Sequence, residues 1–117
     1  MEDWHGLGRA FNKFINEHPV PGELKGLYEP INYILRLGGK RIRPVLCLMA
    51  NELFDGNEQQ AMKAALAVEY FHNFTLIHDD IMDEAPLRRG QKTVHEKWDR
   101  DTAILSGDAL FVKVYQK

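Results

Sequence analysis

The stretch His72 to Gly90 reads HNFTLIHDDIMDEAPLRRG and places an acidic cluster one loop away from an arginine pair. On a helix, His72, Asp79 and Asp83 would fall within about 20° of one line along the axis. Asp80 would lie about 80° to the side of that line. We therefore expect three carboxylates to crowd one end of a helix.

These carboxylates suggest a metal site. Asp79 and Asp83 are i,i+4 neighbours, and like charges at that spacing destabilise a helix unless a cation lies between them. Magnesium binds one or two carboxylates, keeps several waters and takes its other ligands from substrate phosphates. Pro86 disfavours helical geometry at the preceding residue, so the helix should end just past Asp83 and leave these oxygens accessible.

A basic segment precedes the acidic one. Residues 38–44 read GGKRIRP and place Lys40, Arg41 and Arg43 just before the first turn of an expected helix. Cations are unfavourable at the positive end of a helix dipole unless an anion occupies the site. Free helix amides and basic side chains together form a good oxyanion pocket.

A second basic segment follows the acidic one. Arg88 and Arg89 are adjacent, and guanidinium groups can clamp phosphate in a bidentate geometry that lysine cannot supply. Taken alone, each charged segment could be solvated surface, and His72 could be an ordinary hydrogen-bonded histidine. Their coincidence at helix ends indicates magnesium together with a phosphorylated substrate.

Composition sets the general class of the protein. The chain has 117 residues, 44% of them hydrophobic and 27% charged, with a net charge of −2. This length suits one small domain, residues 1–117, and the charge gives no argument for nucleic acid or an anionic membrane. There is no secretory signal and no run of about 18 apolar residues, and the single cysteine, Cys47, lies in an apolar run. We expect a cytoplasmic protein without a transmembrane segment.

Apolar residues recur at helical spacing through most of the chain, and no segment shows sustained alternation. The sequence therefore predicts an all-α antiparallel helical bundle. A proline in the second helix, Pro30, is best tolerated in the first turn. The expected helices run over about Asp3 to Glu17, Pro44 to Phe54, Glu58 to Glu84 and Thr93 to Trp98. The second helix carries an apolar stripe from Leu27 to Leu35 and is closed by Gly38 and Gly39, and a last helix is capped by Asp101 or Thr102 and runs towards Lys117.

Four motifs together resemble the trans-isoprenyl diphosphate synthases, also called polyprenyl synthetases. They are GGKxxRP at residues 38–44, the DDxxD motif of residues 79–83, RRG at residues 88–90 and AILSGDAL at residues 103–110. Their order and spacing both match that family, and the resemblance extends from about Tyr28 to the C-terminus. It implies an N-terminal portion of the isoprenoid synthase fold.

The resemblance also implies roles for individual residues. Asp79, Asp80 and Asp83 would bind Mg²⁺ ions that hold an allylic diphosphate, with Arg88 supporting the same diphosphate. A second set would hold isopentenyl diphosphate, namely Lys40, Arg43, His72 and Arg89. The implied reaction condenses the two substrates into a short- to medium-chain polyprenyl diphosphate.

Product length in this family is limited by bulk before the first aspartate of the DDxxD motif. By resemblance, the aromatic residue five positions before that aspartate, Phe74, would limit the chain. Helix geometry instead favours Thr75, which lies about 40° from Asp79, whereas Phe74 lies about 140° away. Both residues remain candidates for a role in chain length.

The sequence departs from the family in one large respect. Family members are far longer and carry a second aspartate-rich motif, whereas Asp79 and Asp80 form the only adjacent aspartate pair here. A smaller departure is Asp99, where the family usually has glycine. We expect a truncated prenyltransferase with about half of its active site. The alternatives are a non-catalytic half-site subunit that binds diphosphate and a helical packing module.

Self-association is expected on two grounds. The family forms helical homodimers, and half of a helical bundle leaves an apolar face that must be covered. We expect a homo-oligomer, which the molar mass from light scattering would test.

Overall fold

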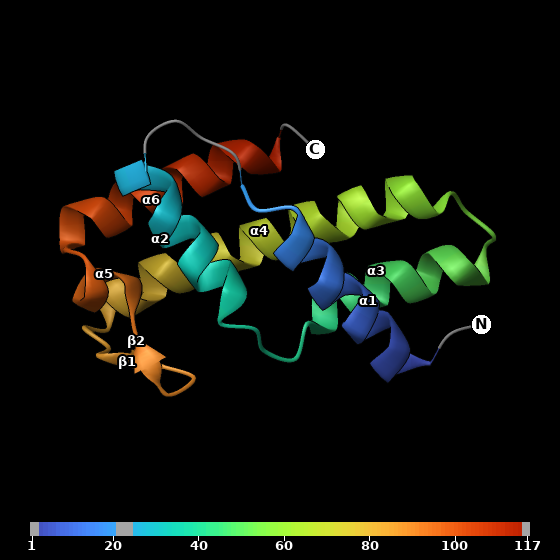
Figure 1. Cartoon of the computed structure of the whole chain (residues 1–117), viewed down its shortest axis with the longest axis horizontal. Coiled ribbons are helices and arrows are strands. Elements are labelled where there is room, and N and C mark those ends of the chain that lie inside the picture. Colours follow the sequence, from blue (N-terminus) through green and yellow to red (C-terminus); the bar gives the residue numbers. More distant parts are fainter. Residues whose placement is uncertain (1–2, 21–24, 116–117) are drawn as a thin grey trace.

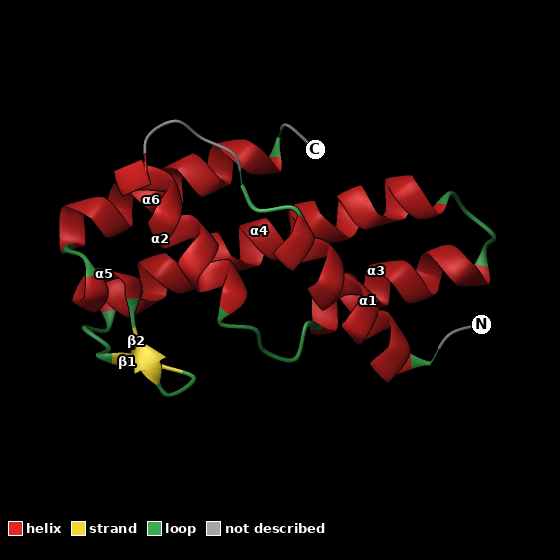
Figure 2. Ribbon diagram, viewed as in Figure 1, coloured by secondary structure: helices red, strands yellow, loops and turns green. Residues whose placement is uncertain are grey.

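The computed structural model describes residues 3–20 and 25–115, which form an elongated bundle of helices (Figure 1). A short antiparallel hairpin of two strands follows the longest helix (Figure 2). The prediction of an all-α bundle is confirmed. In chain order the elements are α1 (Trp4–Glu17), α2 (Lys25–Arg36), α3 (Ile42–Leu53), α4 (Glu58–Met82), β1 (Leu87–Arg88), β2 (Gln91–Lys92), α5 (Val94–Lys97) and α6 (Arg100–Val114).

The longest helix, α4, organises the bundle. Both α3 and α6 pack along it, while α1 packs on α3 and α2 packs on α6. Figure 1 shows α4 running through the middle of the molecule, with the link from α3 at one end and the hairpin at the other. The acidic end of α4 therefore lies beside the hairpin that carries the arginine pair.

The apolar stripe of each helix faces a shared core. Phe11, Ile31, Val45 and Leu110 come from four different helices, and each has a relative exposure of 0%. Burying one such side chain stabilises the fold by roughly 1.5–3 kcal/mol relative to leaving it exposed. The apolar positions predicted for α1 are confirmed as buried or packed against the core: Trp4, Leu7, Phe11, Phe14 and Ile15.

The prediction that Pro30 occupies the first turn of α2 is wrong. The helix begins at Lys25, so Pro30 lies in its interior and cannot donate the hydrogen bond that a residue there normally makes. Side-chain contacts anchor the helix instead. Asn32 pairs with the backbone N–H and C=O of Val20 at 2.8 and 3.2 Å, and Ser106 of α6 donates to the carbonyl of Leu27 at 2.9 Å.

The last helix begins earlier than the sequence pattern predicts. Asp99, rather than Asp101 or Thr102, is the N-cap of α6. Its carboxylate accepts from the backbone N–H of Thr102 at 2.7 Å and from the Thr102 hydroxyl at 3.0 Å. The aspartate that departs from the family pattern thus has a local structural role.

The hairpin was not predicted. Leu87 pairs with Lys92 and Arg88 with Gln91, so residues 89 and 90 form a two-residue turn. Their φ angles are 52° and 78°, and positive φ at both central residues is typical of the tight turns that match strand twist. Strands of two residues are too short to show alternation in the sequence. None of the helices within residues 3–20 and 25–115 is long and apolar enough to cross a membrane.

Asp99→Ala should lower the melting temperature at neutral pH because α6 loses its cap. Hydrogen bonds from Thr102 lower the pKa of the Asp99 carboxyl, so its contribution is complete above the unfolded-state pKa. That contribution is lost as the pH falls through the folded-state pKa. Thermal unfolding followed by circular dichroism should therefore show a difference from the wild type that shrinks in acid.

Asp101→Ala, an exposed carboxylate in the same helical turn, is the matched control for this experiment. A difference between Asp99→Ala and the wild type that stays constant with pH would contradict the capping role.

Candidate functional site

The acidic end of α4 is closed by backbone hydrogen bonds. The amide of Glu84 donates to the carbonyl of Ile81 at 3.2 Å, and the amide of Ala85 donates to that of Asp80 at 2.9 Å. Glu84 has a φ of 53°, in the left-handed conformation that this kind of helix ending requires. The helix thus stops at the predicted place, with Asp83 as its C-cap.

The three aspartates of the DDxxD motif have different surroundings. Asp79 and Asp83 are exposed, whereas Asp80 is only 5% exposed. Both oxygens of Asp80 accept from Arg88, at 2.8 Å from Nε and 2.8 Å from a terminal nitrogen. This bidentate pair raises the pKa of Arg88 and fixes the hairpin against the end of α4.

The second arginine of the hairpin reaches the other basic segment. Gly39 has a φ of 124°, and a Cβ at this position would collide with the guanidinium of Arg89. The side chain of Arg89 therefore lies directly against the backbone of residue 39. Burial, and next the charge of Arg88, lower the pKa of Arg89. The fold thus brings the two predicted basic segments together.

Arg43 and His72 also meet. A terminal nitrogen of Arg43 lies 3.4 Å from Nε2 of His72. Because a guanidinium can only donate, Nε2 accepts and the ring proton lies on Nδ1. Burial, followed by the charge of Arg43, lowers the pKa of His72, so the ring is neutral at neutral pH. A bound anion would oppose the effect of the Arg43 charge.

Lys40, also predicted to bind an anion, lies in a different hollow. This depression of about 390 Å³ runs along α1. It contains further basic side chains, His5 and Arg9, beside Lys40 and Gly39. Lys40 itself is exposed, so its flexible side chain is free to turn.

Arg41 does not belong to the anion pocket in which the sequence placed it. It is 5% exposed, and its guanidinium forms an ion pair with the buried Glu69 of α4. Sequence reasoning missed Glu69 as a functional candidate. The available signal was a carboxylate on the apolar face of α4, because buried glutamate is rare unless it is paired.

The two candidates for product length lie on different sides of α4. The Phe74 ring packs against Phe111 of α6, with centroids 4.8 Å apart, and against His78 at 4.5 Å. Thr75 instead lines a groove of about 460 Å³. Arg43 and His72 also line this groove, and its other lining residues are Ala67, Val68, Phe71 and Val114.

The residues at the acidic end of α4 fit magnesium held jointly with a ligand. Within residues 3–20 and 25–115, no three His, Cys, Asp or Glu side chains are grouped closely enough to bind a metal by themselves. In the same ranges, the carboxylates of Asp79 and Asp83 have no hydrogen bond or ion pair. Two such oxygen donors suit Mg²⁺, which takes the rest of its octahedral shell from water and phosphate.

Comparisons with known proteins agree with this geometry. Residues 24–117 match the family model described as polyprenyl synthetase. A geranylgeranyl pyrophosphate synthase from Geoglobus acetivorans is 46% identical over 108 residues, which cover 92% of this chain and 34% of the relative. A geranylgeranyl diphosphate synthase from Saccharolobus solfataricus is 44% identical over 116 residues, covering 94% and 35%.

Solved structures show the same similarity. A crystal structure of a geranylgeranyl pyrophosphate synthase has a TM-score of 0.93 and 51% identity, covering 99% of this chain and 36% of that one. The structure of the Geoglobus acetivorans enzyme has a TM-score of 0.90 and 43% identity, covering 98% and 38%. The chain thus spans about a third of the length of these relatives.

Gly39→Ala should reduce the free energy of unfolding, because the position has a positive φ and the new methyl group meets Arg89. Most of this loss should remain in an Arg89→Ala background, because the guanidinium is the far end of a flexible, exposed side chain that can move aside. Urea unfolding of the four proteins measures this coupling.

Gly38→Ala is the control for the Gly39 experiment. This glycine has a φ of 79°, and a Cβ added to it would meet nothing within 4 Å, so its penalty should not depend on Arg89. A Gly39→Ala penalty that disappears in the Arg89→Ala background would contradict a backbone origin of that penalty.

Proposed function

The chain belongs to the polyprenyl synthetase family, and on that premise we propose that it forms the N-terminal part of a prenyltransferase. The enzyme would join isopentenyl diphosphate to an allylic diphosphate. The observation that carries the proposal is the placement of a basic group beside the middle of α4 and of an acidic group at the end of that helix. His72 lies beside Arg43, and the exposed Asp79 follows seven residues later, about 10 Å along the same helix face.

The basic group is suited to isopentenyl diphosphate. Burial first, and then the charges of Arg43 and Arg89, lower the pKa of His72, while burial and then the charge of Arg88 lower the pKa of Arg89. A diphosphate would neutralise this excess positive charge and accept bidentate hydrogen bonds from the guanidiniums. Lys40 would join them by turning out of the hollow beside α1.

The acidic group is suited to the allylic diphosphate. Asp79 and Asp83 would hold Mg²⁺, and Asp80 would join them on exchanging its contacts with Arg88. Arg88 would then donate its hydrogen bonds to the same diphosphate. Bound magnesium supplies positive charge that stabilises the departing pyrophosphate.

The groove beside Thr75 would hold the hydrocarbon tail and exclude water from the reacting carbon. The allylic carbon–oxygen bond breaks, pyrophosphate leaves, the isopentenyl double bond forms the new carbon–carbon bond, and one proton is released. No covalent intermediate with a protein side chain is required.

A half-site subunit that binds diphosphate without turnover is the second candidate. It is favoured by the arrangement of the described acidic ligands, which come from one helix end alone. Transfer of labelled isopentenyl diphosphate to a short allylic diphosphate by this chain distinguishes the two candidates, since only the enzyme forms product.

Asp79→Ala should weaken binding of a short allylic diphosphate in the presence of Mg²⁺ by about tenfold or more, because it removes an exposed ligand of the metal. Isothermal titration calorimetry measures this affinity. Asp101→Ala, an exposed aspartate on α6, should bind like the wild type. Binding that needs neither Mg²⁺ nor Asp79 would contradict the assignment of the acidic end.

Thr75→Phe should narrow the groove and weaken binding of a long allylic diphosphate relative to the shortest one. Phe74→Ala should have the opposite effect, because it loosens the packing against Phe111 that supports α6 beside the groove. Calorimetric affinities for allylic diphosphates of increasing length measure both changes. Identical length preferences in the two variants and the wild type would exclude a role for these residues in product length.

A further inference from the structure

We propose that the buried ion pair between Arg41 and Glu69 is a positioning device that fixes Arg43 against His72. Neither residue of the pair would touch a ligand. Both would act through the residues that do. This inference rests on the proposed function, because the geometry in question is that of the proposed site for isopentenyl diphosphate.

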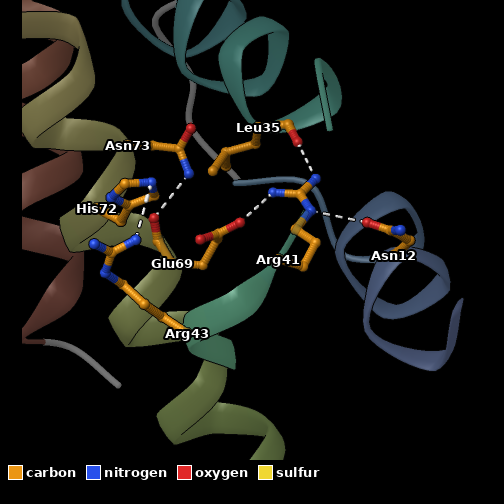
Figure 3. Close-up of polar contacts among 7 residues, drawn as sticks. All are labelled: Asn12, Leu35, Arg41, Arg43, Glu69, His72 and Asn73. Carbon is orange, nitrogen blue, oxygen red and sulfur yellow. Dashed lines mark hydrogen bonds and ion pairs between the residues drawn. The ribbon is translucent and has the colours of Figure 1, made fainter. Parts of the chain in front are cut away.

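Arg41 is held from three directions (Figure 3). Its guanidinium donates to Glu69 of α4 at 2.5 Å, to the side chain of Asn12 of α1 at 2.8 Å and to the carbonyl of Leu35 of α2 at 2.6 Å. The two charged side chains are only 3% and 5% exposed. Each nitrogen of this guanidinium therefore has a protein partner, and each partner comes from a different helix.

Both residues of the ion pair are close in sequence to the residues of the contact between Arg43 and His72. Arg41 precedes Arg43 by two residues, and Glu69 precedes His72 by three, which is one helical turn. The ion pair thus joins the start of α3 to α4 beside the place where Arg43 and His72 meet, as Figure 3 shows. The side chain of Asn73 adds a hydrogen bond of 2.8 Å to the carbonyl of Glu69.

The backbone at Arg41 separates the two arginines. Arg41 has a φ of 52°, a left-handed conformation that is unfavourable for a residue with a side chain. This conformation is compatible with a buried Arg41 followed by an exposed Arg43 at the beginning of α3. The hydrogen bonds of the buried guanidinium compensate for this backbone strain.

A purely stabilising role would not require an ion pair. Well-packed apolar residues of similar volume often replace a buried pair without loss of stability. Apolar residues cannot replace the directional hydrogen bonds by which a guanidinium fixes the orientation of the groups around it. Substitution of both residues therefore separates positioning from stability.

The double variant Arg41→Met/Glu69→Leu tests this inference, because both new side chains are unbranched at Cβ and apolar. The matched control is Lys13→Met/Glu17→Leu, which removes an exposed i,i+4 ion pair on α1. Three quantities are measured: the melting temperature, the nuclear Overhauser effect between the Arg43 side chain and the His72 ring, and the affinity for inorganic pyrophosphate.

In the double variant we expect the Overhauser effect to disappear and the pyrophosphate affinity to fall about tenfold, with a melting temperature close to that of the wild type. The control variant should keep the Overhauser effect and the pyrophosphate affinity of the wild type. A folded double variant that retains the Overhauser effect and binds within about twofold of the wild type would overturn the inference.

Arg41→Lys keeps the test decisive if the double variant does not fold. It keeps a cation beside Glu69 but loses the fork of hydrogen bonds that the guanidinium makes to Glu69, Asn12 and Leu35. We expect it to weaken the Overhauser effect between Arg43 and His72, and an unchanged effect would overturn the inference.

Failure of the proposed function has a different signature. A wild-type chain that does not bind pyrophosphate contradicts that function, whereas the Overhauser effects in the variants still decide the positioning role.

Discussion

A buried guanidinium must find a partner for each of its nitrogens, and this requirement determines where the first basic segment lies. Arg41 meets it with a carboxylate, an amide oxygen and a backbone carbonyl from α4, α1 and α2. Three helices are thereby tied to the residue just before α3. Removing either charge from such a pair would leave the other buried and uncompensated, which is strongly destabilising. The path of the loop and the exposure of Arg43 both follow from this constraint.

The second basic segment, residues 88–90, is positioned by a comparable ion pair at the acidic end of α4. Asp80 holds Arg88 in a bidentate contact, and the tight turn after it carries Arg89 back towards Gly39. The cations that converge there, Arg43 and Arg89, have no anionic partner of equal closeness among the described residues. Burial, and next the charge of Arg43, lower the pKa of His72. The fold thus concentrates positive charge beside an exposed pair of carboxylates, an arrangement that favours a diphosphate with a divalent cation.

Much of this arrangement follows from local sequence. Helical periodicity and punctuation by proline and glycine predict the helices, because each must bury one apolar stripe. The path of Arg41 could not be predicted, since its partners lie 6 to 29 residues away and nothing local separates a buried arginine from an exposed one. The strands of the hairpin are too short to show alternation in the sequence. Asp99 is the N-cap of α6, but the sequence predicted Asp101 or Thr102, because both are also of a suitable capping type. The sequence predicted Pro30 in the first turn of α2, because the contacts of Asn32 and Ser106 that support the helix around Pro30 involve distant parts of the chain.

The central claim is that the basic group beside α4 and the acidic group at its end form one site for diphosphate and metal. Amide NMR spectra of the chain titrated with pyrophosphate and Mn²⁺, which shares the oxygen-ligand preference of Mg²⁺, test it most directly. The account predicts pyrophosphate-induced shifts at residues 38–43, 72 and 88–90, and paramagnetic broadening centred on residues 79–83. Shifts confined to the hollow beside α1, or broadening spread evenly over the acidic surface, would contradict it.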